Sequence, residues 1–156
     1  MAKLFEVSEI LEFAIRIEEN GEVFYREMAK KIKKKEIKAL FNWLADEEVR
    51  HRKIFEEMVS GVGKYEPAES YPGEYFAYLR AYVDEHIFTK EKKGKLMAGK
   101  IGSTKEAVKF AIGVELDSIL YYLEAKNLVP ESQRETIEKI VEEERRHYLK
   151  LKELKP

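Results

Sequence analysis

Apolar side chains recur at three- and four-residue intervals in four stretches of this sequence, the spacing that places them on one face of an α-helix. The stretches cover residues 11–32, 41–58, 108–125 and 137–154. We therefore predict four amphipathic helices. The positions on their faces are Leu11, Ala14, Glu18, Gly21, Tyr25, Met28 and Ile32; Phe41, Leu44, Glu48, His51, Phe55 and Met58; Val108, Ala111, Glu115, Ser118, Tyr122 and Ala125; and Ile137, Ile140, Glu144, His147, Leu151 and Leu154.

The pattern is interrupted over residues 61–102, between the second and third stretches. Prolines and glycines punctuate this segment, and between them Tyr75–Phe88 could form a helix. We expect a long crossover with one short extra helix, whose aromatic residues pack against the bundle or a partner subunit. His86 lies in this crossover and is expected on the surface or at an interface.

The chain also contains an internal repeat. The segment around Glu18 matches the segment around Glu115, and the segment around Glu48 matches that around Glu144 at almost the same displacement along the chain. The sequence therefore predicts two helix hairpins joined by the crossover. This arrangement is an all-α, ferritin-like four-helix bundle, in a single domain that covers residues 1–156.

Composition narrows the range of functions. The 156 residues carry a net charge of −1, which does not favour nucleic acid as a partner. The chain has no cysteine, so it contains no disulfide, catalytic thiol or thiolate metal site. No apolar run approaches the roughly 18 residues of a membrane span, and no signal peptide is recognised. We expect a soluble cytoplasmic protein that does not bind membranes.

Each predicted helical face carries a glutamate at its centre, and two faces add a histidine three residues later. Buried glutamate is rare unless it is paired or bound to a metal. Within each hairpin the two glutamates are equidistant from the predicted turn, near Lys33 or near Val129 and Pro130, so they lie at one height. The predicted cluster is Glu18, Glu48, His51, Glu115, Glu144 and His147.

Four carboxylates in a dry interior repel one another strongly unless cations compensate them. A glutamate from each of two helices and Glu-x-x-His from each of the other two is the ligand set of di-iron and di-manganese bundles. We therefore expect a site for two metal ions, which these donors suit as iron or manganese and which zinc could also occupy. The alternative interpretation is a buried polar network without metal.

With these six residues, and over nearly its whole length, the chain resembles the ferritin-like domain of the rubrerythrins. The resemblance implies a di-iron centre with two bridging carboxylates and one further Glu–His pair on each metal. The implied bridges are Glu48 and Glu144, and the implied pairs are Glu18 with His51 and Glu115 with His147.

Two departures from the rubrerythrin pattern affect the expected function. The chain lacks the cysteine ligands of a rubredoxin-type module, which implies a separate electron-donor protein. It has Ser118 where rubrerythrins carry an additional glutamate. The resemblance implies an oxidoreductase that reduces peroxide or oxygen, with a role in oxidative stress. We also expect a homodimer, in which the long crossover would permit domain swapping.

Two other functions fit the same ligand set. In an iron-handling ferroxidase, Fe(II) is itself the substrate and is oxidised at the centre. In a non-enzymatic helical binding module, a redox-silent metal has a structural role only.

Residues at matching positions of the two half-repeats lie close to the predicted ligands and suggest further roles. Gly21 and Ser118 follow the ligands of their helices by three residues, and they either leave space for oxygen or peroxide or permit close helix packing. Tyr25 and Tyr122 follow them by seven residues. These tyrosines either hydrogen-bond the ligands and act as redox neighbours, or are ordinary core aromatics.

Glu47 and Glu143 directly precede the predicted bridging glutamates. A metal-bound histidine usually donates its second N–H to a carboxylate or a carbonyl group. The two glutamates are candidates for that acceptor across the bundle, and a solvated helix face is the alternative interpretation.

Overall fold

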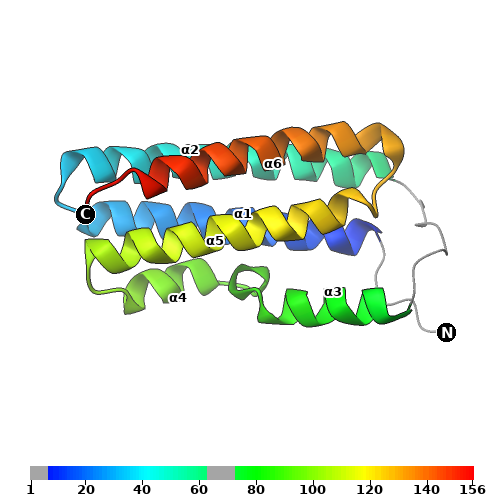
Figure 1. The fold of residues 1–156 in the computed structure, drawn as a ribbon, viewed down its shortest axis with the longest axis horizontal. Helices are drawn as coiled ribbons and strands as arrows, with labels where there is room; N and C mark the ends of the chain where they lie inside the picture. Colours follow the sequence, from blue (N-terminus) through cyan, green and yellow to red (C-terminus); the bar gives the residue numbers. More distant parts are fainter. Residues whose placement is uncertain (1–6, 63–72) are drawn as a thin grey trace.

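Figure 1 shows a computed structural model of the protein, which describes residues 7–62 and 73–156. Within these ranges the chain forms helices and no β-strand. None of the described helices is both long and apolar enough to cross a membrane. The elements are α1 (Val7–Lys31), α2 (Lys35–Val62), α3 (Gly73–Glu85), the 3₁₀ helix η1 (Ile87–Thr89), α4 (Lys93–Lys100), α5 (Thr104–Lys126) and α6 (Glu131–Lys152).

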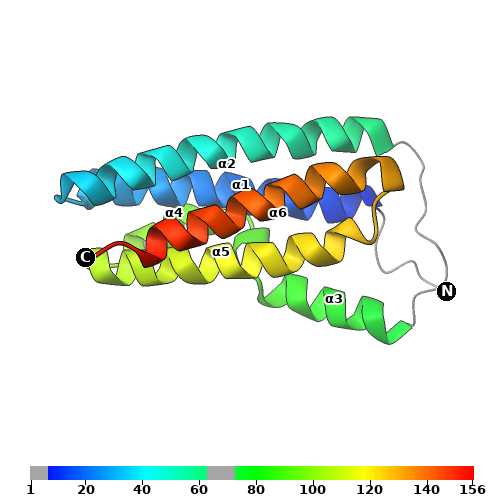
Figure 2. The same cartoon turned by 45° about the horizontal axis from the view of Figure 1, so that its top comes forward.

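The four long helices form two antiparallel hairpins that lie side by side (Figures 1 and 2). Residues 32–34 join α1 to α2, and residues 127–130 join α5 to α6. The prediction of an all-α bundle made of two helix hairpins and a long crossover is confirmed.

The helical faces predicted from the apolar spacing form the core of the bundle. Leu11, Phe41, Ala111 and Ile137, one from each long helix, are completely buried. Burying a large apolar side chain stabilises a protein by roughly 1.5–3 kcal/mol, so these faces hold the hairpins together. The polar cluster in the middle of the bundle depends on the apolar packing around it.

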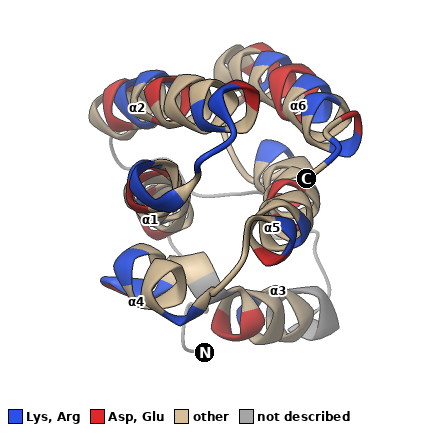
Figure 3. Cartoon of the chain, turned by 90° about the vertical axis from the view of Figure 1, so that its left-hand side faces the viewer, with Lys and Arg blue, Asp and Glu red and all other residues tan. Residues whose placement is uncertain are grey.

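The crossover contains more structure than the sequence predicted. In place of one helix over Tyr75–Phe88 it forms α3, η1 and α4, which lie along α1 and α5 on the side away from α2 and α6 (Figure 3). Pro67 and Pro72 lie outside the described residues. The crossover therefore covers one side of the bundle as an additional layer.

Aromatic residues of the crossover pack on the bundle, as predicted. The Phe88 ring lies 6.0 Å from that of Phe24 and 5.7 Å from that of Phe110. The Tyr82 ring is stacked 6.4 Å from that of Tyr121. The side chains of Tyr75 and Phe76 are outside the described part of the structure.

Asn20 of α1 explains why the crossover helix is divided. Its side-chain amide donates hydrogen bonds to the backbone oxygens of Phe88 at 2.8 Å and Lys90 at 2.7 Å. Its side-chain oxygen accepts from the backbone N–H of Gly94 at 2.9 Å. Backbone groups of the segment between α3 and α4 therefore form hydrogen bonds with α1 instead of within a continuous helix.

His86 is buried against the bundle, so the prediction of a surface or interface position is wrong. Its Nδ1 accepts a hydrogen bond from the Phe88 backbone N–H at 3.2 Å and caps η1. Its ring meets that of Tyr82 edge-on at 6.0 Å. Burial lowers the pKa of His86 from 6.5 to about 4, because the imidazolium ion would lose its hydration.

Replacing His86 with asparagine should reduce the loss of folding stability in acid. At pH values above 6.5 the imidazole is neutral in both the folded and the unfolded chain. Between that pH and about pH 4 the unfolded chain binds a proton that the folded chain excludes, which lowers the free energy of unfolding by up to about 3 kcal/mol. Asparagine keeps a hydrogen-bond acceptor but does not titrate.

Urea unfolding of the metal-free parent and of His86→Asn over this pH range measures the difference. As the pH falls, the free energy of unfolding of the variant should rise relative to that of the parent. A difference that stays constant with pH would contradict the assignment.

Candidate metal centre

Four glutamates and two histidines meet in the middle of the bundle. All six are buried, with 5% or less of their surface exposed. The structure brings together every residue of the predicted cluster. They are Glu18 of α1, Glu48 and His51 of α2, Glu115 of α5, and Glu144 and His147 of α6.

One half of the cluster is formed by Glu18, His51 and Glu144. The Nδ1 atom of His51 lies 2.7 Å from Glu144 Oε1 and 3.7 Å from Glu18 Oε2. One ligand atom from each residue fits within a span of 4.8 Å. This half therefore offers one nitrogen and two oxygen donors to a common point.

The other half is formed by Glu48, Glu115, Glu144 and His147, whose ligand atoms also lie within 4.8 Å of one another. His147 Nδ1 is 3.6 Å from Glu144 Oε2 and 3.9 Å from Glu115 Oε2. The carboxyl group of Glu144 thus faces both halves, one oxygen toward each histidine. A shared carboxylate is the geometry of a bridge between two ions.

Polar atoms that face this space lack hydrogen-bond partners although they are buried. Buried polar atoms are nearly always paired, and leaving one unpaired costs about 1–3 kcal/mol. His51 Nδ1 and Glu144 Oε1 approach to 2.7 Å and face the same space. A cation would satisfy the whole set, so these residues fit a metal. The atoms are Glu18 Oε2, His51 Nδ1, Glu115 Oε2, Glu144 Oε1 and His147 Nδ1.

The positive charge of the histidines offsets the negative charge of the four carboxyl groups only in part. Burial and the neighbouring carboxyl groups raise the pKa of Glu48 and Glu115 well above the usual range. Burial would also raise the pKa of Glu144, but a hydrogen bond with Glu115 and the charge of His51 hold it well below. Burial would lower the pKa of His51, but Glu144 and Glu18 raise it well above its usual value. Protons therefore take the place of cations in the metal-free cluster.

A charged layer supports the outer side of both histidines. Glu143 Oε2 lies 2.6 Å from His51 Nε2, and Glu47 Oε2 lies 3.6 Å from His147 Nε2. Arg50 donates to both glutamates, at 2.6 Å to Glu47. The interpretation of these glutamates as partners of the histidines across the bundle is confirmed for Glu143, and that of a solvated face is wrong for it. Arg50 was not predicted; its position three residues after Glu47, on the same helix face, is the signal that would have identified it.

Two tyrosines donate hydrogen bonds into the cluster, and both cross between the hairpins. Tyr25 Oη donates to Glu115 Oε1 at 2.7 Å, and Tyr122 Oη donates to Glu18 Oε1. Each tyrosine holds one oxygen of its glutamate, and the other oxygen of the same carboxyl group has no hydrogen-bond partner. Of the two interpretations offered by the sequence, hydrogen bonding to the ligands is the one that the structure shows.

Gly21 provides room for a carboxylate. A Cβ atom at this position would lie 2.5 Å from Glu48 Oε2 and 2.9 Å from its Cδ. The space beside Gly21 is therefore filled by Glu48, which corresponds to close packing and not to an open channel for oxygen or peroxide. Ser118, at the equivalent position of α5, is also buried.

A buried carboxylate and histidine cluster that can bind metal, held in a bundle of two helix hairpins, defines a ferritin-like carboxylate protein. The rubrerythrin profile matches residues 9–155, and the chain belongs to the rubrerythrin family. Its structure is similar to that of a ferritin-like diiron-carboxylate protein from Thermotoga maritima, with 33% identity over 96% of this chain and 93% of that chain and a TM-score of 0.66.

A hypothetical protein from Pyrococcus furiosus shares the fold at 21% identity, over 95% of this chain and 87% of that chain, with a TM-score of 0.64. No curated protein matches the sequence.

Metal binding should strengthen as the pH rises. Glu48, Glu115 and His51 have raised pKa values in the metal-free cluster, and a cation must displace the protons that they hold. Anaerobic calorimetric titration with Fe(II), in buffers of different ionisation enthalpy, counts the protons released. A metal affinity that does not change with pH, without proton release, would contradict this description.

Substituting Gly21 with alanine should weaken metal binding, because the added Cβ forces the Glu48 carboxylate to move. Changes next to metal ligands typically cost 10–100-fold in affinity, and we expect a loss of about tenfold or more. Gly113→Ala is the matched control, since a Cβ there meets nothing within 4 Å. Equal metal affinity in the two variants would show that the space beside Gly21 is unimportant.

Proposed function

We propose that this protein is a non-haem di-iron oxidoreductase that reduces peroxide or oxygen at the buried carboxylate cluster. The observation that supports it most directly is the set of buried oxygen and nitrogen atoms that converge on one space without hydrogen-bond partners. Family membership and the similarity to a diiron-carboxylate protein support iron as the metal. Carboxylate oxygens and imidazole nitrogens suit ferrous and ferric iron.

The donor set divides naturally between two ions. Glu144 faces both histidines and would bridge the two ions. Glu48 lies with Glu115, Glu144 and His147, and membership of the rubrerythrin family supports it as the second bridge. Bound ferrous ions would supply one electron each to the oxidant. The proposed terminal ligands are Glu18 and His51 on one ion, and Glu115 and His147 on the other.

The protein's own groups would control orientation and protons. Glu143 holds the His51 imidazole from outside at 2.6 Å, which fixes the nitrogen presented to the metal. Glu47 lies 3.6 Å from the outer nitrogen of His147, beyond hydrogen-bond distance. Tyr25 and Tyr122 hold one oxygen of a carboxylate each and leave the other free to bind. Burial keeps bulk water away from the reacting atoms.

Electrons for repeated turnover would come from a separate one-electron carrier. The chain has no cysteine and so contains no thiolate iron–sulfur site of its own. A redox partner that docks on the surface is therefore part of the proposal.

The reaction is tested by loading the anaerobic protein with two Fe(II) ions per chain and adding peroxide or oxygen. The near-ultraviolet absorption of the oxidised centre should appear and disappear again when a one-electron donor is supplied. Repeated cycles with consumption of the oxidant support the proposal. Many irons accumulating per chain would instead indicate iron handling, and two bound ions that do not react would indicate a structural metal.

The ligand assignment is tested separately. Glu144→Ala should lose at least one metal ion, since it removes the carboxylate common to both halves. Glu142→Ala, which removes an exposed carboxylate on the same helix, is the matched control and should retain both ions. Full metal content in Glu144→Ala would refute the bridging role.

A further inference from the structure

Four tyrosine rings follow one another from the protein surface to the metal cluster. The ring centroids of Tyr78 and Tyr82 are 6.4 Å apart, those of Tyr82 and Tyr121 are 6.4 Å apart and nearly parallel, and those of Tyr121 and Tyr122 are 5.9 Å apart. Tyr78 is 52% exposed, whereas Tyr121 and Tyr122 are completely buried. Tyr122 ends the series by donating a hydrogen bond to Glu18.

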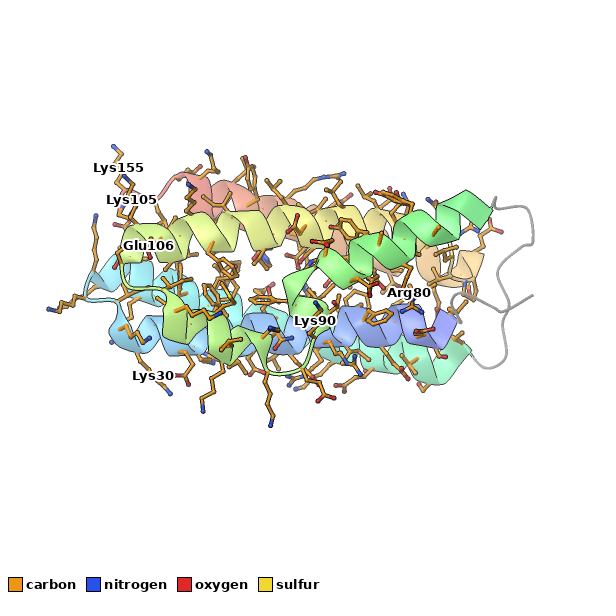
Figure 4. The ribbon with its side chains drawn as sticks, turned by 90° about the horizontal axis from the view of Figure 1, so that it is seen from below. Lys30, Arg80, Lys90, Lys105, Glu106 and Lys155 are labelled. Atoms are coloured by element: carbon orange, nitrogen blue, oxygen red, sulfur yellow. The ribbon has the colours of Figure 1, made fainter. Side chains whose placement is uncertain are left out.

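We propose that these four rings form a redox path that carries single electrons from a reductant docked at α3 to the metal centre. The proposal rests on the oxidoreductase function proposed above. Figure 4 looks onto the face concerned, where α3 runs in front of α5 and the labelled Arg80 reaches toward α1. The path thus starts on the crossover layer and ends inside the bundle.

A tyrosine that loses an electron also loses its phenol proton, and an acceptor for that proton is present at the inner and at the outer part of the path. When the oxidant at the centre takes an electron from Tyr122, its proton moves along the existing hydrogen bond to Glu18 Oε1. An electron from Tyr82 then restores Tyr122, and the proton returns. The Tyr82 hydroxyl group donates to the backbone oxygen of Asp117 in a solvent-exposed hydrogen bond, and its ring is only half-buried. Its proton therefore leaves to water and is regained when the surface reductant supplies an electron through Tyr78.

Tyr121 connects these ends without losing its proton. Its hydroxyl group donates to the backbone oxygen of Ile10 at 2.6 Å in a buried hydrogen bond. A carbonyl oxygen does not accept a proton at neutral pH, and the buried Tyr121 lacks the access to water that Tyr82 has. The ring therefore serves as the bridge between Tyr82 and Tyr122. The net change is one electron moved from the reductant to the centre. Peroxide takes up two electrons and two protons to become two molecules of water, so a peroxide that does not receive its electrons from the ferrous ions uses the path twice.

The equivalent tyrosine of the other half-repeat has different neighbours. Tyr25 also hydrogen-bonds a cluster glutamate, but its ring contacts Phe24 at 5.5 Å and Phe41 at 5.2 Å. Phenylalanine is far harder to oxidise than tyrosine, so these contacts do not continue a path. The two halves of the repeat therefore provide a matched internal comparison.

Trp43 is a further oxidisable ring near the cluster, and its surroundings disfavour it. It is 40% exposed and lies 5.2 Å from the ring of His147. However, the Lys150 Nζ atom sits 5.4 Å from the centre of its ring, and a positive charge there opposes an indole radical cation. Tyr82 is instead near the carboxylates of Asp117 and Glu124, which favour the loss of an electron.

The path can be tested without metal. Because the chain has no cysteine, Glu85→Cys gives a single attachment point on the exposed end of α3, three residues after Tyr82, for a ruthenium polypyridyl photo-oxidant. A laser flash with a sacrificial acceptor oxidises the nearby tyrosines. Ascorbate then removes radicals at the surface, and electron paramagnetic resonance detects those that have moved inside. We expect a radical population that resists ascorbate.

Tyr122→Phe in the labelled protein should lose this protected population, because the buried end of the path is gone. Tyr25→Phe removes the equivalent hydroxyl group from the other half, and Trp43→Phe removes the competing ring; both should retain it. Absence of a protected radical in the labelled parent, or its persistence in Tyr122→Phe, would overturn the proposal. Circular dichroism establishes that each variant is folded.

The iron-loaded protein provides a second, independent test of the path. Tyr82→Phe should slow the peroxide consumption that an external one-electron donor sustains, and should lengthen the lifetime of the tyrosyl radical that peroxide generates inside the protein. The single oxidation of the ferrous centre by peroxide should not change, because Tyr82 does not touch the cluster. An unchanged radical lifetime and an unchanged rate of donor-driven consumption would overturn the path even if the centre reacts. If the iron centre does not react at all, the proposed function fails, while the flash experiment still decides whether the path exists.

Discussion

The structure depends on keeping four carboxyl groups together in the interior of a helical bundle. Their mutual repulsion must be offset by positive charge, whether protons or metal ions. Most of the features around the cluster serve this constraint: Gly21 makes room for Glu48, and Tyr25 and Tyr122 each hold one carboxylate oxygen. Glu143 fixes His51 from outside, so that its free nitrogen points inward. A dinuclear metal centre is the arrangement that satisfies all of these groups at once.

The two hairpins are similar in sequence, but the fold makes them unequal. The crossover layer covers α1 and α5 and leaves α2 and α6 open on the opposite side (Figure 3). Tyr122 therefore continues through Tyr121 into α3, whereas Tyr25 is enclosed by phenylalanines. Arg50 ties two glutamates together across the bundle, whereas its repeat counterpart Arg146 pairs with Glu142 on its own helix. The repeat thus supplies the buried cluster, and its divergence is the basis of the electron path that we propose.

The bundle and the cluster could be predicted because both depend on local periodicity. Helical spacing gives the faces, and equal distance from each turn gives the heights, so the six residues follow from the sequence alone. The crossover could not be predicted in the same way. Its division into α3, η1 and α4 depends on hydrogen bonds from Asn20, far away in the chain. The burial of His86 and the ion pairs of Arg50 likewise require the positions of other helices.

Anomalous scattering from crystals grown with Fe(II) would locate the metal ions directly. We expect two iron peaks per chain inside the bundle, one beside His51 Nδ1 and one beside His147 Nδ1, with Glu144 in contact with both. A single peak, or iron bound only at surface carboxylates, would contradict this expectation.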